Sequence, residues 1–123
     1  MTPTENPHST TLQYVHWFRH SAPYINAHRN KTFVIMFDGE AVLHENFQHI
    51  IHDIALLHSL GIRLILVHGA RPQINQNLKF SQIDTPFHMQ RRVTTRESLS
   101  CVMNAVGSIR LQIEALLSMG LAN

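Results

Sequence analysis

The sequence predicts a three-layer α/β fold in which a parallel β-sheet is flanked by helices. Two short apolar runs, residues 32–37 and 62–67, have the β-branched and aromatic composition of buried strands. Between them, residues 45–60 place apolar side chains at helical spacing and end at Gly61. A strand, a helix and a strand with short joints form a parallel, right-handed crossover unit. We therefore expect one layered domain over residues 30–123.

The first part of the chain is expected to lie outside this layered domain. Residues 1–9 are polar and contain two prolines, which is typical of a flexible leader. Residues 10–29 are expected to form a helical segment. Because proline is tolerated in a first turn but not in a helix interior, Pro23 predicts two helical pieces, over residues 11–19 and 22–28.

Two further helices are expected after the second strand. Pro72 can open one that ends near residues 78–80, and residues 81–89 are expected to be a loop with one short strand. Thr94 and Glu97 have the spacing of a capping box before the last helix. The apolar face predicted for that helix consists of Leu99, Val102, Met103, Val106, Ile109, Ile113, Leu116 and Leu117.

Composition excludes several classes of protein. An apolar content of 44% with only 15% charged residues indicates a globular chain rather than a disordered one. A formal charge of +2 is too balanced for a nucleic-acid groove. The apolar runs are too short to span a bilayer, and we find no signal-peptide pattern. Cys101 is the single cysteine, so no internal disulfide can form and a cytoplasmic location is expected.

Ten histidines raise the question of a metal site. His16 and His20 are four residues apart on a predicted helix, and His49 and His52 are three apart. Neither pair has the glutamate of a zinc-binding HExxH helix or an evident third ligand. We interpret them as solvated side chains, and expect no metal and no cofactor.

The ends of the two predicted strands are the expected ligand site. The second strand ends at Gly69, and Pro72 follows where a helix would begin. In open α/β sheets anionic ligands bind at such junctions, because free helix N–H groups point outward there. Asp38 and Gly39 follow the first strand and are expected to face the same crevice. His68 is expected to order its loop through a backbone hydrogen bond.

Residues 67–74, VHGARPQI, resemble the VHGGGPQI loop of acetylglutamate kinases. Together with their flanks they resemble more closely the kinase-fold domain of bacterial N-acetylglutamate synthases. The other matching segments are WFRHSAPYIN (17–26), FVIM (33–36), HENF (44–47), LLHSLGIR (56–63) and RVT (92–94). The resemblance implies a partial amino-acid-kinase-like (carbamate-kinase-like) fold.

In that family an arginine-sensing domain precedes an acetyltransferase domain of the GNAT type, which transfers acetyl from acetyl-CoA to glutamate in arginine biosynthesis. No acetyltransferase pattern occurs in this sequence. It is therefore expected to be an N-terminal fragment, a short gene product or a truncated chain. Alone, it would be a regulatory or oligomerisation module without catalysis.

The resemblance also argues against kinase chemistry. Kinases of the family place a lysine in the first strand and a glycine pair after it, whereas this sequence has Met36 and then Asp38-Gly39. A thioether cannot stabilise a transferred phosphoryl group, and a carboxylate repels it. Met36 and Ala70-Arg71 are typical of the synthases, but Asp38 departs even from their usual glycine. An acetylglutamate kinase-like phosphotransferase is the alternative.

Arg92 matches the arginine with which the kinases grip a substrate carboxylate. This match implies a vestigial acylamino-acid pocket formed by Gly39, Gly69, Ala70, Arg71 and Arg92. The alternative is that Arg92 pairs with Glu97 or Asp84 and only fixes the loop before the last helix.

The N-terminal helix is the second candidate region. In arginine-sensitive relatives such a helix joins dimers into rings, which makes Tyr14, Trp17 and Phe18 candidate contacts of a homo-oligomer. The alternative is an amphipathic helix that packs on its own domain. An unpaired sheet edge could also bind a partner, so the chain could be a stand-alone protein that joins the oligomer of a longer synthase. L-Arginine is an expected effector only of full-length members, because most of their arginine-binding residues would lie beyond residue 123.

Overall fold

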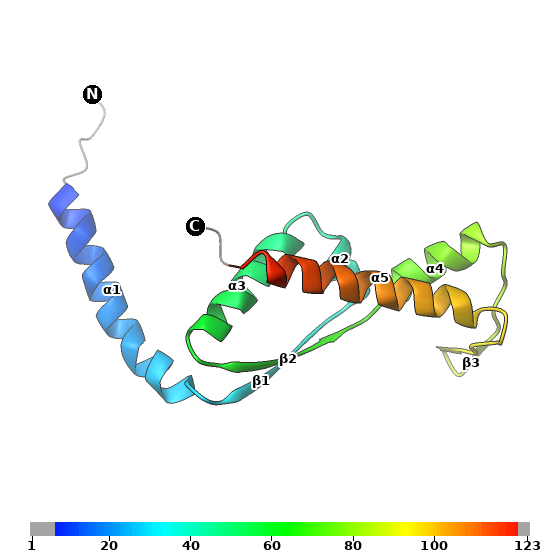
Figure 1. The fold of residues 1–123 in the computed structure, drawn as a ribbon, viewed down its shortest axis with the longest axis horizontal. Helices are drawn as coiled ribbons and strands as arrows, with labels where there is room; N and C mark the ends of the chain where they lie inside the picture. The colour runs from blue at the N-terminus through cyan, green and yellow to red at the C-terminus, as the bar shows by residue number, and fades with distance from the viewer. Residues whose placement is uncertain (1–6, 121–123) are drawn as a thin grey trace, which may run out of the picture.

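The structure is a computed structural model that describes residues 7–120 (Figure 1). Helix α1 (Pro7–His28) extends away from the other elements. It is one continuous helix, so the prediction of two pieces is wrong. Residues 11–20 are exposed throughout, and water can therefore satisfy the Arg19 carbonyl that Pro23 leaves without a donor. The helix begins at Pro7, and the rest of the expected leader, residues 1–6, lies outside the described residues.

A parallel pair of strands forms the predicted sheet. Strand β1 (Thr32–Phe37) pairs with strand β2 (Arg63–His68) in a register that runs from Thr32 opposite Arg63 to Phe37 opposite His68. Exposure alternates along both strands, as the side-chain period of two requires. The inner face, formed by Ile35, Phe37, Leu64 and Leu66, packs against the hydrophobic core.

Four helices accompany this sheet: α2 (Gly39–Leu43), α3 (Phe47–Ser59), α4 (Arg71–Phe80) and α5 (Leu99–Ser118). Figure 1 shows α3 and α5 on the same side of β1 and β2. The predictions of α3 and α4 are confirmed, but α2 was not predicted. The buried core that these helices share consists of Val42, Phe47, Ile51, Ile54, Ala70, Ile109 and Ile113.

The start of α5 differs from the prediction. The reciprocal capping pair is Thr95 and Ser98, one residue later than expected: the Thr95 N–H donates to Ser98 Oγ at 2.9 Å, and the Ser98 N–H donates to Thr95 Oγ1 at 3.2 Å. The buried face is also shifted, to Cys101, Ala105, Ile109 and Ile113. Met103, expected to be buried, is 65% exposed. Small side chains face α4 because the two helices lie close together, as the hydrogen bond from Asn77 Nδ2 to the Cys101 carbonyl shows.

A short hairpin connects α4 to α5. Strands β3 (Phe87–His88) and β4 (Arg91–Arg92) pair antiparallel, so the loop expected over residues 81–89 contributes one of two short strands. Met89 and Gln90 form the turn with φ of 47° and 62°, a left-handed conformation that non-glycine residues adopt at a cost.

The α/β class with a parallel sheet is confirmed, and within residues 7–120 the helices cover one face of that sheet. Val34, Met36, Ile65 and Val67 form the opposite, outer face and are between 42% and 80% exposed. In the same range, no helix has the length and apolar content that a membrane span requires.

Candidate functional site

The carboxyl ends of β1 and β2 meet in the predicted crevice. Asp38, Gly39 and Glu40 from one loop and Gly69, Ala70 and Arg71 from the other line a cleft of about 430 Å³. Four of the five expected pocket residues therefore lie together. Parallel strands bring this about, because their carboxyl ends reach the same edge of the sheet.

The two glycines allow the loops to approach closely. A β-carbon on Gly39 would lie 2.5 Å from Gln73 Oε1 and 2.7 Å from Pro72 Cδ, which is closer than atoms can pack. A β-carbon on Gly69 would lie 3.2 Å from the Gly39 nitrogen. The Gln73 side-chain amide closes the contact by donating to the Gly39 carbonyl at 2.7 Å. Loop packing therefore explains the glycines without any phosphate.

Asp38 supplies its own negative charge to this cleft. Its Oδ1 accepts a hydrogen bond from the Ala41 backbone N–H at 2.8 Å, which makes Asp38 the N-cap of α2. An N–H group that could bind an external anion is thus already paired. Aspartate followed by glycine and glutamate is a sequence signal for a helix start, and it is the signal that could have revealed this cap.

The charges lining the cleft do not favour a phosphoryl group. Asp38 and Glu40 contribute two carboxylates and Arg71 one guanidinium. The position matched to the kinase lysine is Met36, whose side chain is 80% exposed on the outer face of the sheet. The lining of this cleft thus contains no lysine.

Arg92 lies in a neighbouring cleft of about 210 Å³, which it shares with Arg71 rather than with the glycines. Its guanidinium donates to Thr85 Oγ1 and to Asn75 Oδ1 and lies 4.9 Å from the centre of the Phe87 ring. The ion pair with Glu97 or Asp84, which was the alternative for Arg92, is not formed, and Arg110–Glu114 is the only ion pair within the described part of the chain. Sequence could not show these partners, because the fold brings them together from three separate segments.

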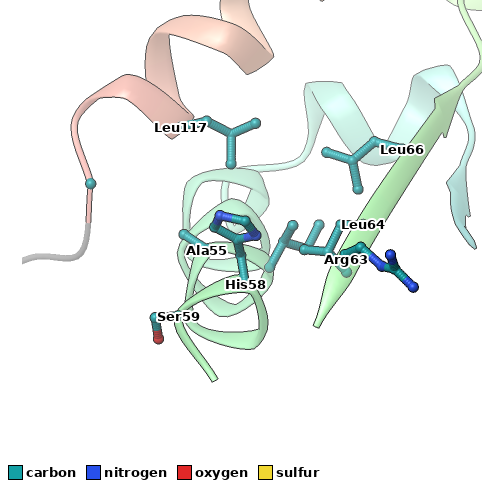
Figure 2. Close-up of a pocket in the computed structure, with 9 residues that line it drawn as sticks. Ala55, His58, Ser59, Arg63, Leu64, Leu66 and Leu117 are labelled. Carbon is teal, nitrogen blue, oxygen red and sulfur yellow. The ribbon is translucent and has the colours of Figure 1, made fainter. Parts of the chain in front are cut away.

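Two larger cavities were not predicted. One, of about 620 Å³, lies between α3, β2 and the end of α5. Figure 2 shows Ala55, Leu64, Leu66 and Leu117 around it, whereas the guanidinium of Arg63 points away. The other, of about 680 Å³, runs between α4 and α5 and is lined by Gln73, Gln76, Asn77, Asn104 and Gln112 among others. The first cavity offers few polar groups with which to fix a ligand.

Two single residues behave as expected. His68 Nδ1 lies 3.3 Å from the Gly69 carbonyl oxygen, the local hydrogen bond expected at this loop. Cys101 is 6% exposed and packs as a small apolar residue, with its sulfur 3.5 Å from Ser81 Oγ. Among the described residues, no three or more histidine, cysteine, aspartate or glutamate side chains converge on one point.

Parallel strands that end in apposed glycine loops define an α/β fold with a cleft at the carboxyl ends of its strands. The chain belongs to the amino acid kinase family, whose family model matches residues 31–123. This confirms the fold that the loop over residues 67–74 implied.

Amino-acid acetyltransferases are among its relatives. The chain is 54% identical over 110 residues to an amino-acid acetyltransferase of Pseudomonas syringae pv. tomato, matching 89% of this chain and 26% of that protein. It is 56% identical over 109 residues to an amino-acid acetyltransferase of Azotobacter vinelandii, matching 89% of this chain and 25% of that protein. These matches confirm the resemblance to the synthases.

Solved structures give the same result. N-Acetylglutamate synthase from Neisseria gonorrhoeae, complexed with coenzyme A and N-acetyl-glutamate, matches with a TM-score of 0.73 and 33% identity, over 85% of this chain and 25% of that one. The same enzyme complexed with coenzyme A and L-arginine matches with a TM-score of 0.74 and 32% identity, over 89% of this chain and 26% of that one. The chain thus spans about a quarter of the length of the relatives it matches.

Proposed function

We propose that this chain is a non-catalytic regulatory and assembly module of an amino-acid N-acetyltransferase, an N-acetylglutamate synthase of arginine biosynthesis. The observation that carries the proposal is the Asp38 carboxylate, which caps α2 inside the cleft where a kinase would hold phosphate. The identity of 54% to an amino-acid acetyltransferase supports the choice of enzyme. A cytoplasmic location agrees with such a role.

The cleft argues against the alternative, a phosphotransferase. Phosphoryl transfer requires cations and open backbone N–H groups around the migrating group. Here Asp38 and Glu40 would repel it, and the Ala41 N–H is already paired. We infer that the acylamino-acid pocket is vestigial, because Gly39 and Gly69 are needed for loop packing and Arg92 is held by protein partners.

Helix α1 supports the assembly role. Tyr14, Trp17 and Phe18 are 70%, 68% and 62% exposed, although aromatic side chains of this size favour burial. Aromatic side chains dominate the binding energy of many interfaces. We infer that these three residues are the contacts of a homo-oligomer. The same exposure supports a second candidate, a stand-alone protein that joins the oligomer of a longer synthase.

The arginine response is assigned to the longer proteins. A related synthase has been crystallised with L-arginine, and this chain spans 26% of that polypeptide. We infer that this chain alone does not form a complete effector site. Titration of the purified chain with L-arginine in a calorimeter is expected to give no binding heat.

The assembly role can be tested by measuring mass in solution. The chain alone, and the chain co-expressed with the Pseudomonas syringae acetyltransferase, are separated by size-exclusion chromatography with light scattering. We expect an oligomer or a mixed complex, and its loss in W17A/F18A. The control is F80A, which removes an aromatic side chain that is 92% exposed but lies on α4. Monomers that do not associate with the synthase would contradict this role.

A further inference from the structure

Two histidines on α1 lie close enough to bind one ion. His16 and His20 are one helical turn apart, and their ring centroids are 4.2 Å apart. Both residues are exposed, and neither side chain forms a hydrogen bond to another described residue. The sequence alone favoured solvated side chains; from this ring separation we propose instead that His16 and His20 form a two-ligand site for a transition-metal cation of the Cu²⁺, Ni²⁺ and Zn²⁺ class.

The geometry suits a helix-borne chelate. Imidazole nitrogens bind such cations at about 2.0–2.1 Å, so two nitrogens on one ion lie roughly 3 Å apart. Rings whose centroids are 4.2 Å apart reach that separation by side-chain rotation alone, without movement of the backbone. Histidines four residues apart on one helix face are the spacing that zinc-binding helices use. Water completes the coordination of the ion.

The other pair on a helix is less suited. His49 and His52 on α3 are three residues apart, with ring centroids 6.4 Å apart and rings nearly perpendicular at 85°. Both rings would have to move to share an ion. His52 is also partly buried, which restricts its rotation. This pair is therefore a matched control, with the same residue types on a different helix.

The surroundings predict which cation binds. The α1 sequence contains no aspartate or glutamate, and Arg19 lies beside His20. No carboxylate of α1 therefore attracts the cation, and affinity depends on the bonds from imidazole nitrogen to the metal. The expected order is Cu²⁺ above Ni²⁺ and Zn²⁺. Ca²⁺ and Mg²⁺, which prefer oxygen ligands, are not expected to bind here.

The test is calorimetric titration of the untagged chain with NiCl₂ at about pH 7.5. H16Q and H20Q are each expected to lower the Ni²⁺ affinity by about tenfold or more, because the second imidazole otherwise binds at high effective concentration. H49Q is expected to leave the affinity unchanged. Lowering the pH to about 5.5 should abolish binding, since protons compete for the nitrogens.

A variant with altered spacing distinguishes binding of one Ni²⁺ by both histidines from non-specific binding of Ni²⁺ to single histidines. The double variant H20Q/A22H keeps ten histidines and an exposed one on α1, but places the pair six residues apart. It is expected to bind Ni²⁺ no better than H20Q does. If H16Q, H20Q and H20Q/A22H all titrate like the wild type with unchanged helical circular dichroism, the proposal is wrong. An equal loss of affinity in H49Q would contradict it as well.

Discussion

The two faces of the β1–β2 sheet carry similar apolar side chains and differ in what lies against them. On the inner face, Leu64 and Leu66 are partly buried against the core that α3 and α5 complete. On the outer face, the neighbouring Ile65 and Val67 are 51% and 42% exposed. Runs that are apolar at every position are typical of parallel strands buried on both sides. The residue types of these strands are therefore suited to burial on both faces. In this structure, the position of the helices determines that only the inner face is buried.

The most direct test of the difference between the two faces is a pair of alanine substitutions at adjacent residues of β2. L66A on the inner face is expected to lower the free energy of unfolding by about 2–3 kcal/mol, because it leaves a cavity against α3 and α5. I65A on the outer face is expected to cost less than about 1 kcal/mol, because its side chain is already half exposed. Urea unfolding of both variants measures the difference. Equal losses would show that the outer face is covered in solution.

Glycine substitutions test the close packing between the loop after β1 and helix α4, at the carboxyl ends of the strands. G39A places a β-carbon 2.7 Å from the Pro72 ring and is expected to cost about 1–3 kcal/mol, the usual penalty for overpacking. G107A is the control, because a β-carbon there meets no atom within 4 Å. As Gly107 lies inside α5, G107A is expected to stabilise by up to about 1 kcal/mol. Thermal unfolding of both variants tests the opposite signs, and a stabilised G39A would contradict the close contact.

Substitutions at the capping pair test how much the start of α5, a helix on the inner face of the sheet, contributes to stability. T95A removes the Oγ1 that accepts from the Ser98 N–H and is expected to cost about 1 kcal/mol. The matched control is T94A, at the position that the sequence pattern favoured, where the structure shows no capping hydrogen bond. Its unfolding free energy is expected to stay within about 0.5 kcal/mol of the wild type. A larger loss in T94A than in T95A would reverse the assignment.

The smallest effect on stability is expected from a charge on the outer face. I65E is expected to change the free energy of unfolding by less than about 1 kcal/mol, since water already reaches half of the Ile65 side chain. The same variant should lower the fluorescence of a dye that binds exposed apolar surface, because it interrupts the cluster of Val34, Met36, Ile65 and Val67. Unchanged dye fluorescence would show that the face is not accessible.

Most of the fold could be predicted from local patterns. Both strands, α3 and α4 follow from apolar composition, helical spacing and the Gly61 and Pro72 signals. Helix α2 was missed because it has only five residues and its N-cap, Asp38, directly follows a strand. The predicted buried face of α5 was wrong because small residues, Cys101 and Ala105, face α4 where larger side chains would not fit.

The candidate site was partly predictable, because local patterns also place residues at the ends of strands. Sequence placed Gly39, Gly69, Ala70 and Arg71 at strand ends, and parallel topology brings strand ends together. The resemblance implied the same pocket for Arg92, but the structure puts it in a neighbouring cleft, where its partners Asn75, Thr85 and Phe87 come from α4, a loop and β3. Contacts of that kind depend on the tertiary fold rather than on spacing along the chain.

The absence of phosphotransfer is tested most directly by ADP release. The purified chain is incubated with ATP, Mg²⁺ and N-acetylglutamate beside a heat-inactivated sample, with an acetylglutamate kinase as positive control. With Met36 in place of a lysine and Asp38 paired to the Ala41 N–H, ADP is expected to stay at the level of the inactivated sample. ADP formation that rises with the amount of native chain and requires N-acetylglutamate would contradict the account.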